Sequence, residues 1–340
     1  MRFFHGQPHS RRHSSRRVAC RATRTHWWFS LTLLAAAALP ARQTSFVRAA
    51  SVPGAARAAA VGSQPAPTPE ELRLLLERVI ASTHRSDAAE ADYARTEHWV
   101  ERRHAGDAAP SLDRVYRVYP TGTGTLKVLL AESGTRVTPE KYRGELRELE
   151  QDLEWALDPE EPNQHARVEK WKKRTAERYR AVESFRDAYE IRWLGTERLE
   201  NFSGPEPLVK LLLDPKSGSS PGSIATELLA ASRITMWVVP GTGGVVQLDA
   251  ELIRDLSFGG GLLGKIDKGG RVHIEQTEVA PGIWLPRVIA SNVRGRKFIF
   301  HEESIRTVRT RDHLRVGPPA ELLPRVRREL SNPELQVPAP

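Results

Sequence analysis

The segment closest to a catalytic motif is a glycine-rich run at residues 259–265. Gly259 and Gly264-Lys265 match the Gly-x4-Gly-Lys part of a phosphate-binding loop. The match stops there, because Ile266 stands where a Ser or Thr would bind magnesium. The residues that follow lead into a strand-like run, so the site would lack the helix N-terminus that holds a phosphate. We therefore interpret the run as a flexible connection between strands, or as an apolar flap at the mouth of a cavity.

Other residues with chemical potential are not arranged in a recognisable site. Six histidines of the predicted folded part are scattered, without HExxH or paired metal-ligand spacing: His98, His104, His165, His273, His301 and His313. Carboxylate pairs such as Glu275 and Glu278 lie in strand-like runs, where exposed acidic side chains are common. The sequence therefore predicts a protein that is not an enzyme and that uses no metal or cofactor.

Residues 232–310 consist of strand-like runs separated by tight-turn residues. The separators are Pro240-Gly241, Gly243-Gly244, Gly269-Gly270, Pro281-Gly282 and Gly295. Glycine supplies positive φ angles and proline fixes φ, which suits both to sharp reversals. Strands joined by such short turns leave no room for crossover helices. The spacing therefore predicts an antiparallel meander.

Alternation within this region gives the sheet one apolar face. Val246, Leu248, Ala250 and Leu252 share one face, and the acidic or amide residues between them share the other. Helices are expected at 69–83, 138–157 and 163–186, and they are available to cover the apolar face. We predict an α+β fold: a long, curved antiparallel sheet, forming an open half-barrel, with helices on its concave side.

The N-terminal 49 residues have the features of an export leader. They contain nine arginines and no Asp or Glu, followed by an apolar run of 13 residues at 27–39. That run suits a signal peptide and is short for a membrane span. Without these arginines the chain has 51 − 9 = 42 basic and 42 acidic residues, which argues against nucleic-acid binding. The only cysteine, Cys20, precedes the apolar run, so no disulfide is expected afterwards.

Several strings in the later part resemble a known superfamily. They are Leu256-Ser-Phe-Gly-Gly-Gly-Leu-Leu-Gly264, Glu278-Val-Ala-Pro-Gly-Ile-Trp-Leu-Pro286 and Gly295-Arg-Lys-Phe298. Together with the exported, cysteine-free organisation, they resemble uncharacterised envelope proteins of the lipoprotein-carrier (LolA-like) superfamily. The resemblance covers roughly 70–330 and implies a half-barrel that holds acyl chains beneath lid helices. No individual carrier residue has a match here, so no functional residue is transferred.

The predicted organisation is a signal peptide (1–49), a disordered linker (50–67), one LolA-like domain (68–330) and a flexible tail (331–340). We expect a periplasmic or secreted protein, without a stable membrane span after leader cleavage, that binds a lipid, acyl chain or other apolar ligand. The residues expected to line the cavity are aromatic or aliphatic: Trp237, Phe258, Leu262, Leu263, Trp284, Phe298 and Phe300. The alternative is an envelope interaction module with a packed interior. A cavity of several hundred Å³ would favour the first, and native-density packing the second.

Overall fold

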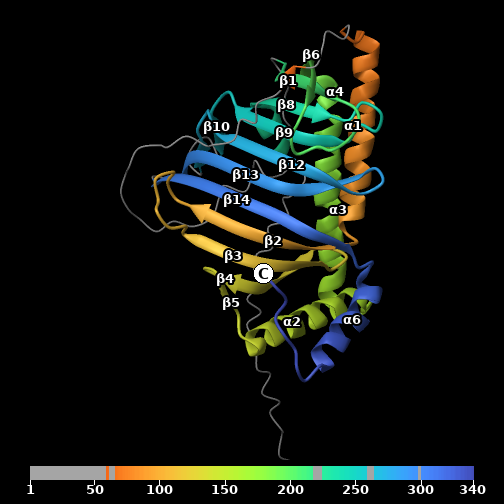
Figure 1. Ribbon diagram of the computed structural model, residues 1–340, viewed down its shortest axis with the longest axis vertical. Helices are drawn as coiled ribbons and strands as arrows, with labels where there is room; N and C mark the ends of the chain where they lie inside the picture. The colour runs from red at the N-terminus through yellow and green to blue at the C-terminus, as the bar shows by residue number, and fades with distance from the viewer. Residues whose placement is uncertain (1–58, 61–65, 217–223, 259–263, 298–299) are drawn as a thin grey trace, which may run out of the picture.

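The computed structural model describes residues 59–60, 66–216, 224–258, 264–297 and 300–340. Within them, six helices and fourteen strands are present (Figure 1). The helices are α1 (Pro69–Glu90), α2 (Pro139–Leu157), α3 (Pro162–Glu183), α4 (Phe185–Ala188), α5 (Ile224–Ala230) and α6 (Pro319–Ser331). The strands are β1 (Ala59–Ala60), β2 (Tyr93–Arg102), β3 (Leu112–Pro120), β4 (Thr125–Glu132), β5 (Thr135–Arg136), β6 (Tyr189–Arg198), β7 (Leu208–Pro215), β8 (Ser232–Val238), β9 (Val245–Leu252), β10 (Leu256–Phe258), β11 (Gly264–Ile266), β12 (Arg271–Ala280), β13 (Ile283–Lys297) and β14 (Phe300–Arg315).

The strands form one open, curved antiparallel sheet. Its order is β1-β6-β7-β8-β9-β12-β13-β14-β2-β3-β4-β5, with a small β10–β11 hairpin attached through β11 to β13. The predicted meander is confirmed, because β8, β9, β12, β13 and β14 lie side by side in the sheet in the order in which they occur along the chain. The β10–β11 hairpin is inserted between β9 and β12. The N-terminal strands extend the sheet beyond β14, which pairs with β2. The predicted α+β class, with a curved sheet covered by helices, is therefore confirmed.

Local sequence signals explain where the helices begin. Thr68 caps α1 in a reciprocal capping box with Glu71, and Thr138 caps α2 by accepting a hydrogen bond from the Lys141 amide. α1 runs to Glu90, past the predicted end at residue 83, and within this extension the small side chain of Ser86 is buried.

The turn between β8 and β9 depends on glycine. Gly243 has a φ of 71°, and a Cβ atom there would lie 2.3 Å from the carbonyl carbon of Arg78. Only glycine allows this approach without strain, so the turn can pack directly against α1.

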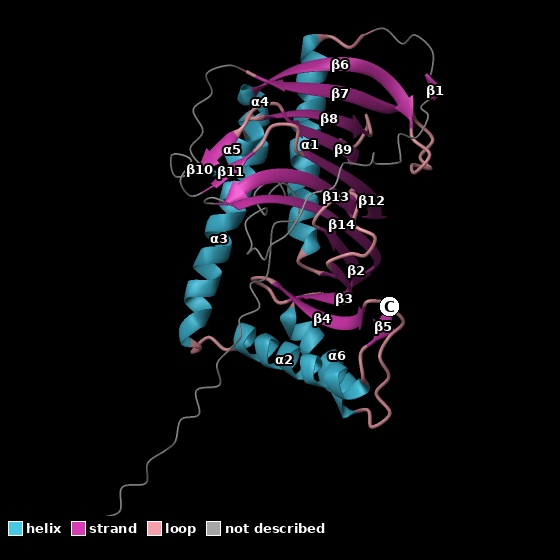
Figure 2. Ribbon diagram, turned by 90° about the vertical axis from the view of Figure 1, so that its left-hand side faces the viewer, coloured by secondary structure: helices cyan, strands magenta, loops and turns pink. Residues whose placement is uncertain are grey.

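Helices α1, α3 and α5 pack on one face of the sheet, called the covered face below (Figure 2). Four side chains of α1 form its buried stripe: Leu75, Leu76, Val79 and Ile80, none more than 5% exposed. They join apolar residues of the central strands, such as Ile234 and Met236, in the main core. Burial of this apolar surface holds helices and sheet together.

A second core lies on the opposite face, called the outer face, at the β3–β4 end. Val128 of β4 is fully buried there, whereas its neighbour Lys127 points to the covered face. Helices α2 and α6 supply the rest of this core, so α2 does not share the face of α1 and α3. Leu335, which the sequence places in a flexible tail, is 6% exposed in this core. Burial of this apolar side chain attaches part of the tail to the core.

Candidate functional site

Helix α3 extends along the covered face but contributes little to the core. Of its 22 residues only Ala181 and Val182 are buried, both in the last turn. Towards its N-terminus, half-buried side chains recur at helical spacing, including Val168, Trp171 and Arg174. Most of α3 therefore lies over the covered face without being embedded in it.

A few specific contacts hold α3 in place. Arg178 Nη2 donates to Asp87 Oδ2 of α1 at 2.9 Å, and both side chains are nearly buried, at 12% and 6% exposed. The ring of Tyr179 stacks on His84, with 4.2 Å between the ring centroids. These contacts are polar or aromatic, and they fasten the middle and end of α3 to the last turns of α1.

A buried cluster of charges lies on the covered face of β2 and β4. Glu97 is 1% exposed, and its oxygens accept from Arg95 Nε at 2.7 Å and from Trp99 Nε1 at 2.8 Å. Lys127 Nζ lies 3.3 Å from Glu97 Oε2 and 3.4 Å from the Trp99 ring centroid. Arg95 also pairs with Glu90 at the end of α1. The cluster joins the strands to the C-terminal end of α1.

Each charged side chain of this cluster has a partner of opposite charge. Burial alone would raise the pKa of Glu97, but Lys127 and Arg95 outweigh it and lower that pKa to about 2. Burial lowers the pKa of Lys127 to about 8, against the attraction of Glu97. Both groups are therefore mainly charged at neutral pH, and both carboxylate oxygens of Glu97 are occupied. Glu97 is poorly suited to general acid–base catalysis, which needs a pKa near the working pH.

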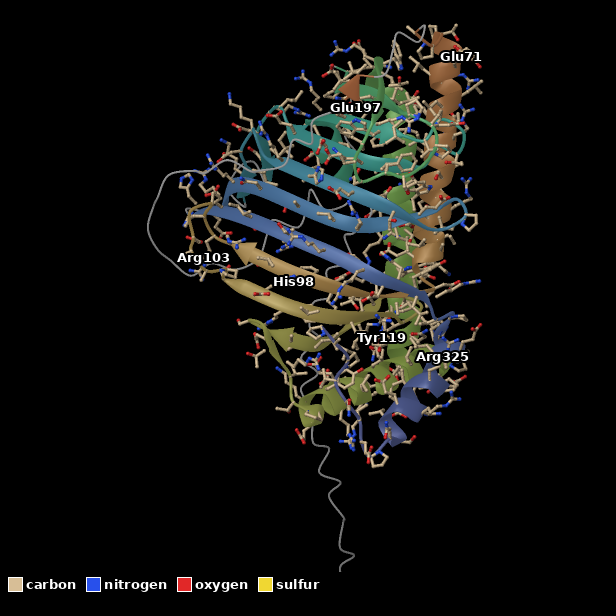
Figure 3. The ribbon with its side chains drawn as sticks, viewed as in Figure 1. Glu71, His98, Arg103, Tyr119, Glu197 and Arg325 are labelled. Atoms are coloured by element: carbon tan, nitrogen blue, oxygen red, sulfur yellow. The ribbon has the colours of Figure 1, made fainter. Side chains whose placement is uncertain are left out.

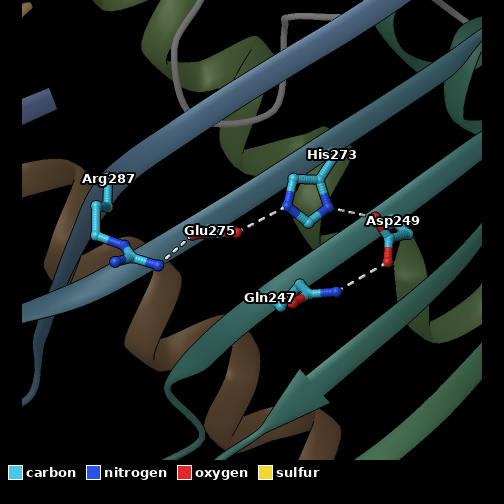
Figure 4. Close-up of polar contacts among 5 residues, drawn as sticks. All are labelled: Gln247, Asp249, His273, Glu275 and Arg287. Atoms are coloured by element: carbon cyan, nitrogen blue, oxygen red, sulfur yellow. Dashed lines mark hydrogen bonds and ion pairs between the residues drawn. The ribbon is translucent and has the colours of Figure 1, made fainter. Parts of the chain in front are cut away.

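The outer face carries a second polar network across β9, β12 and β13 (Figure 4). His273 Nδ1 contacts Asp249 Oδ1 at 2.6 Å, and His273 Nε2 contacts Glu275 Oε1 at 3.1 Å. Gln247 donates to Asp249, and Arg287 pairs with Glu275. The hydrogen bond to Asp249 is the main cause of a raised pKa for His273, and burial opposes it. With both nitrogens facing carboxylates, the charged form of the imidazole is favoured.

This network arises from strand register and a β-bulge. Asp249 pairs with His273 across β9 and β12, although 24 residues separate them. Arg287 is the extra residue of an irregularity between Glu275 and Gln276 in the β12–β13 pairing, and a bulge re-aims a side chain. The sequence showed His273 only as one scattered histidine. Correct pairing of the two strands was the signal that could have revealed its partners.

Two of the predicted cavity residues, Trp237 and Trp284, lie in one small cluster with Leu199, Leu208 and Val246. Trp237 Nε1 donates to Glu197 Oε2 at 3.0 Å (Glu197 is labelled in Figure 3). It alternates with Met236 and Val238 of the main core and so faces away from it.

Two of the other predicted cavity residues lie at strand ends. Phe258 ends β10 and Phe300 begins β14. Leu262, Leu263 and Phe298 lie outside the described residues.

A small cavity lies between α1 and the β12–β13 hairpin. Its volume is about 20 Å³, and its lining includes Ser82, Ser86, Gln276 and Trp284. That is room for about one water molecule. Trp284 Nε1 is buried without a hydrogen-bond partner beside it, while its backbone amide donates to Ser86 Oγ at 3.0 Å. This cavity cannot hold an acyl chain as it stands.

The described part of the chain gives no sign of a metal centre: no group of three or more His, Cys, Asp or Glu side chains is placed to hold an ion. None of the described helices is long and apolar enough to cross a membrane. The chain matches no family model, no curated protein and no solved structure.

Proposed function

We propose that the protein is an exported, non-enzymatic carrier that binds an apolar ligand, such as a lipid or lipoprotein acyl chain, between α3 and the covered face. The observation that carries the proposal is that α3 lies on the covered-face side of the sheet (Figure 2) while burying only Ala181 and Val182. A helix with so little core is suited to move as a lid. α1, which buries a continuous apolar stripe, would stay in place.

The energetics of opening are compatible with reversible binding. Moving α3 would break the Arg178–Asp87 and Arg167–Asp152 ion pairs and the Tyr179–His84 stack, and it would expose few apolar side chains. Each buried methylene of a ligand contributes about 0.8 kcal/mol, so an acyl chain can offset this cost. Because the cavity of about 20 Å³ is too small for such a chain, the ligand would enter only when α3 moves.

The proposal is tested by locking the lid. In a Cys20→Ser background, His84→Cys of α1 and Tyr179→Cys of α3, which replace the stacked rings, are linked with a short bis-maleimide. Before linkage, this variant should take up a fluorescent fatty acid at least as well as the parent protein, and after linkage uptake should fall at least tenfold. The matched control is Glu150→Cys with Arg327→Cys, which links α2 to α6 at an ion pair away from α3. Equal uptake by locked and unlocked protein would contradict the lid.

A second candidate is the interaction module with a packed interior. It is favoured by the water-sized cavity and by the fixed charge network around His273 on the outer face. Under this candidate, no lipid copurifies from the periplasm and no fatty acid binds before or after linkage. The carrier predicts copurifying lipid, so native mass spectrometry of the protein purified from a periplasmic extract separates the two.

Export itself rests on residues 1–49, which lie outside the described residues. A periplasmic or secreted location is therefore proposed from the arginine-rich segment and the apolar run alone. Fractionation of cells that express the full chain, and a chain without residues 1–49, tests it. Finding the full chain in the cytoplasm would contradict the proposed export, and with it the proposed role as a periplasmic lipid carrier.

A further inference from the structure

Two arginines, Arg174 and Arg178, lie one turn apart on the inner side of α3, and only Arg178 has an ion pair among the described residues. Arg178 pairs with Asp87 at 2.9 Å, yet its Nε atom is buried without a hydrogen-bond partner. Arg174 is half-buried, and its Nε donates at 3.3 Å only to the Lys170 carbonyl of its own helix. Among the described residues, no acidic side chain forms an ion pair with Arg174. Here a guanidinium faces inward without a counter-ion.

The charge balance here differs from that of the neighbouring cluster. Glu97 and Glu90 serve the two cations Arg95 and Lys127, so that cluster is closely neutralised. At α3, by contrast, like charges at i and i+4 repel each other, and in the described part of the chain the only ion pair of either arginine is that of Arg178 with Asp87. Burial lowers the pKa of Arg174, and the charge of Arg178 lowers it further. One positive charge is left over where water is partly excluded.

Apolar side chains continue the same face of α3 away from the arginines. Trp171 lies one turn before Arg174, and Val168 lies one turn earlier still; both are half-buried. The inner face of the proposed lid thus has a cationic part and an apolar part in sequence. This order is complementary to a single-chain amphiphile with an anionic head.

We infer that Arg174, assisted by Arg178, binds the carboxylate of a fatty acid whose chain lies along Trp171 and Val168. A guanidinium donates paired hydrogen bonds to a carboxylate, and the single uncompensated charge matches a monoanion. The inference rests on the proposed function, since it names the ligand class of the same lid.

The test compares cis-parinaric acid with its methyl ester, which has the same chain without the charge. Titrations by fluorescence use the full chain and the variants Arg174→Gln and Arg180→Gln. Arg180 is an exposed arginine of the same helix, so it is the matched control. Wild type and Arg180→Gln should bind the acid about tenfold more tightly than the ester. Arg174→Gln should lose this preference while its affinity for the ester stays unchanged.

Each other outcome is decisive. Equal binding of acid and ester by wild type overturns the carboxylate site and leaves the apolar carrier standing. A preference that survives in Arg174→Gln assigns the head to other residues and overturns the site as well. Binding of neither probe refutes both the carrier and this inference. Tighter Arg174-dependent binding of a lysophosphatidic acid than of the fatty acid would assign the site to phosphate and refute the carboxylate.

Discussion

Glu97 is the most deeply buried charged side chain of the covered-face cluster, and it serves three donors at once. Replacement by Gln keeps the volume but removes the charge that Arg95 and Lys127 face. Breaking a buried ion network by removing one partner costs about 3–5 kcal/mol. We therefore expect Glu97→Gln to lower the free energy of unfolding by about that amount in urea titrations. Glu190→Gln, at an exposed position of β6, should change it by less than about 0.5 kcal/mol.

The pH dependence of this difference gives an independent check. The pKa of Glu97 is about 2 when folded and 4.5 ordinarily, so the folded state favours the ionised form. The stabilisation is present above pH 4.5 and is lost as the pH falls towards 2. The difference in unfolding free energy between wild type and Glu97→Gln should therefore become smaller as the pH falls from 4.5 towards 2. A gap that stays constant down to pH 2 would mean that packing, not charge, explains the loss.

The contribution of His273 to stability should depend on pH in the opposite direction to that of Glu97. Its pKa is raised above the ordinary 6.5 by Asp249 and Glu275, so its stabilisation is fully present below pH 6.5 and is lost as the pH rises through the folded-state pKa. We expect the stability difference between wild type and His273→Gln to be of the order of 1 kcal/mol or less at pH 5.5, because the pair is partly exposed, and to shrink as the pH rises above 6.5. His165→Gln, at an exposed position on α3, should show no such trend.

At the scale of elements, α3 is expected to open without the rest of the molecule. It buries two residues in 22, whereas α1 buries six in 22, and local opening is easiest where few apolar contacts hold a segment. Amide exchange followed by mass spectrometry should give α3 peptides less protection than α1 peptides. Asp87→Asn should increase exchange in α3 further, because it removes the partner of Arg178.

The control for this experiment is Glu150→Gln, which removes a partner of Arg327 between α2 and α6. It should leave exchange in α3 unchanged. Equal protection of α1 and α3 in wild type would show that α3 is an integral layer, and the lid would have to be abandoned.

The elements were predictable where a local signal specifies them. Thr68 and Thr138 mark helix starts through caps, and Gly243 marks a turn that only glycine allows. Their neighbours in space were harder to derive. The pairing of β14 with β2 joins residues about 200 positions apart, and no local pattern encodes it. The contacts of Glu97 with Lys127 and of His273 with Asp249 also join different strands, so neither could be predicted from spacing along the chain alone.

For the whole molecule, the decisive feature is that two cores share one sheet. The main core lies on the covered face, and the α2–α6 core lies on the outer face at the β3–β4 end. Adjacent residues of β4 face the two sides, Lys127 towards Trp99 and Val128 towards α2 and α6. Losing either core would therefore disturb strands on which the other one depends. We expect the two cores to unfold together.

This expectation is tested with one cavity in each core. Leu146→Ala removes a fully buried side chain of α2, and Ile234→Ala removes one of β8 that is 1% exposed. Each should lower the free energy of unfolding by about 2–5 kcal/mol. In both variants, tryptophan fluorescence and far-UV circular dichroism should follow one coincident urea transition. The exposed Leu194→Ala, 48% exposed on β6, should unfold like wild type. A biphasic curve in Leu146→Ala, with the first phase confined to part of the signal, would instead make the α2–α6 end an independent unit.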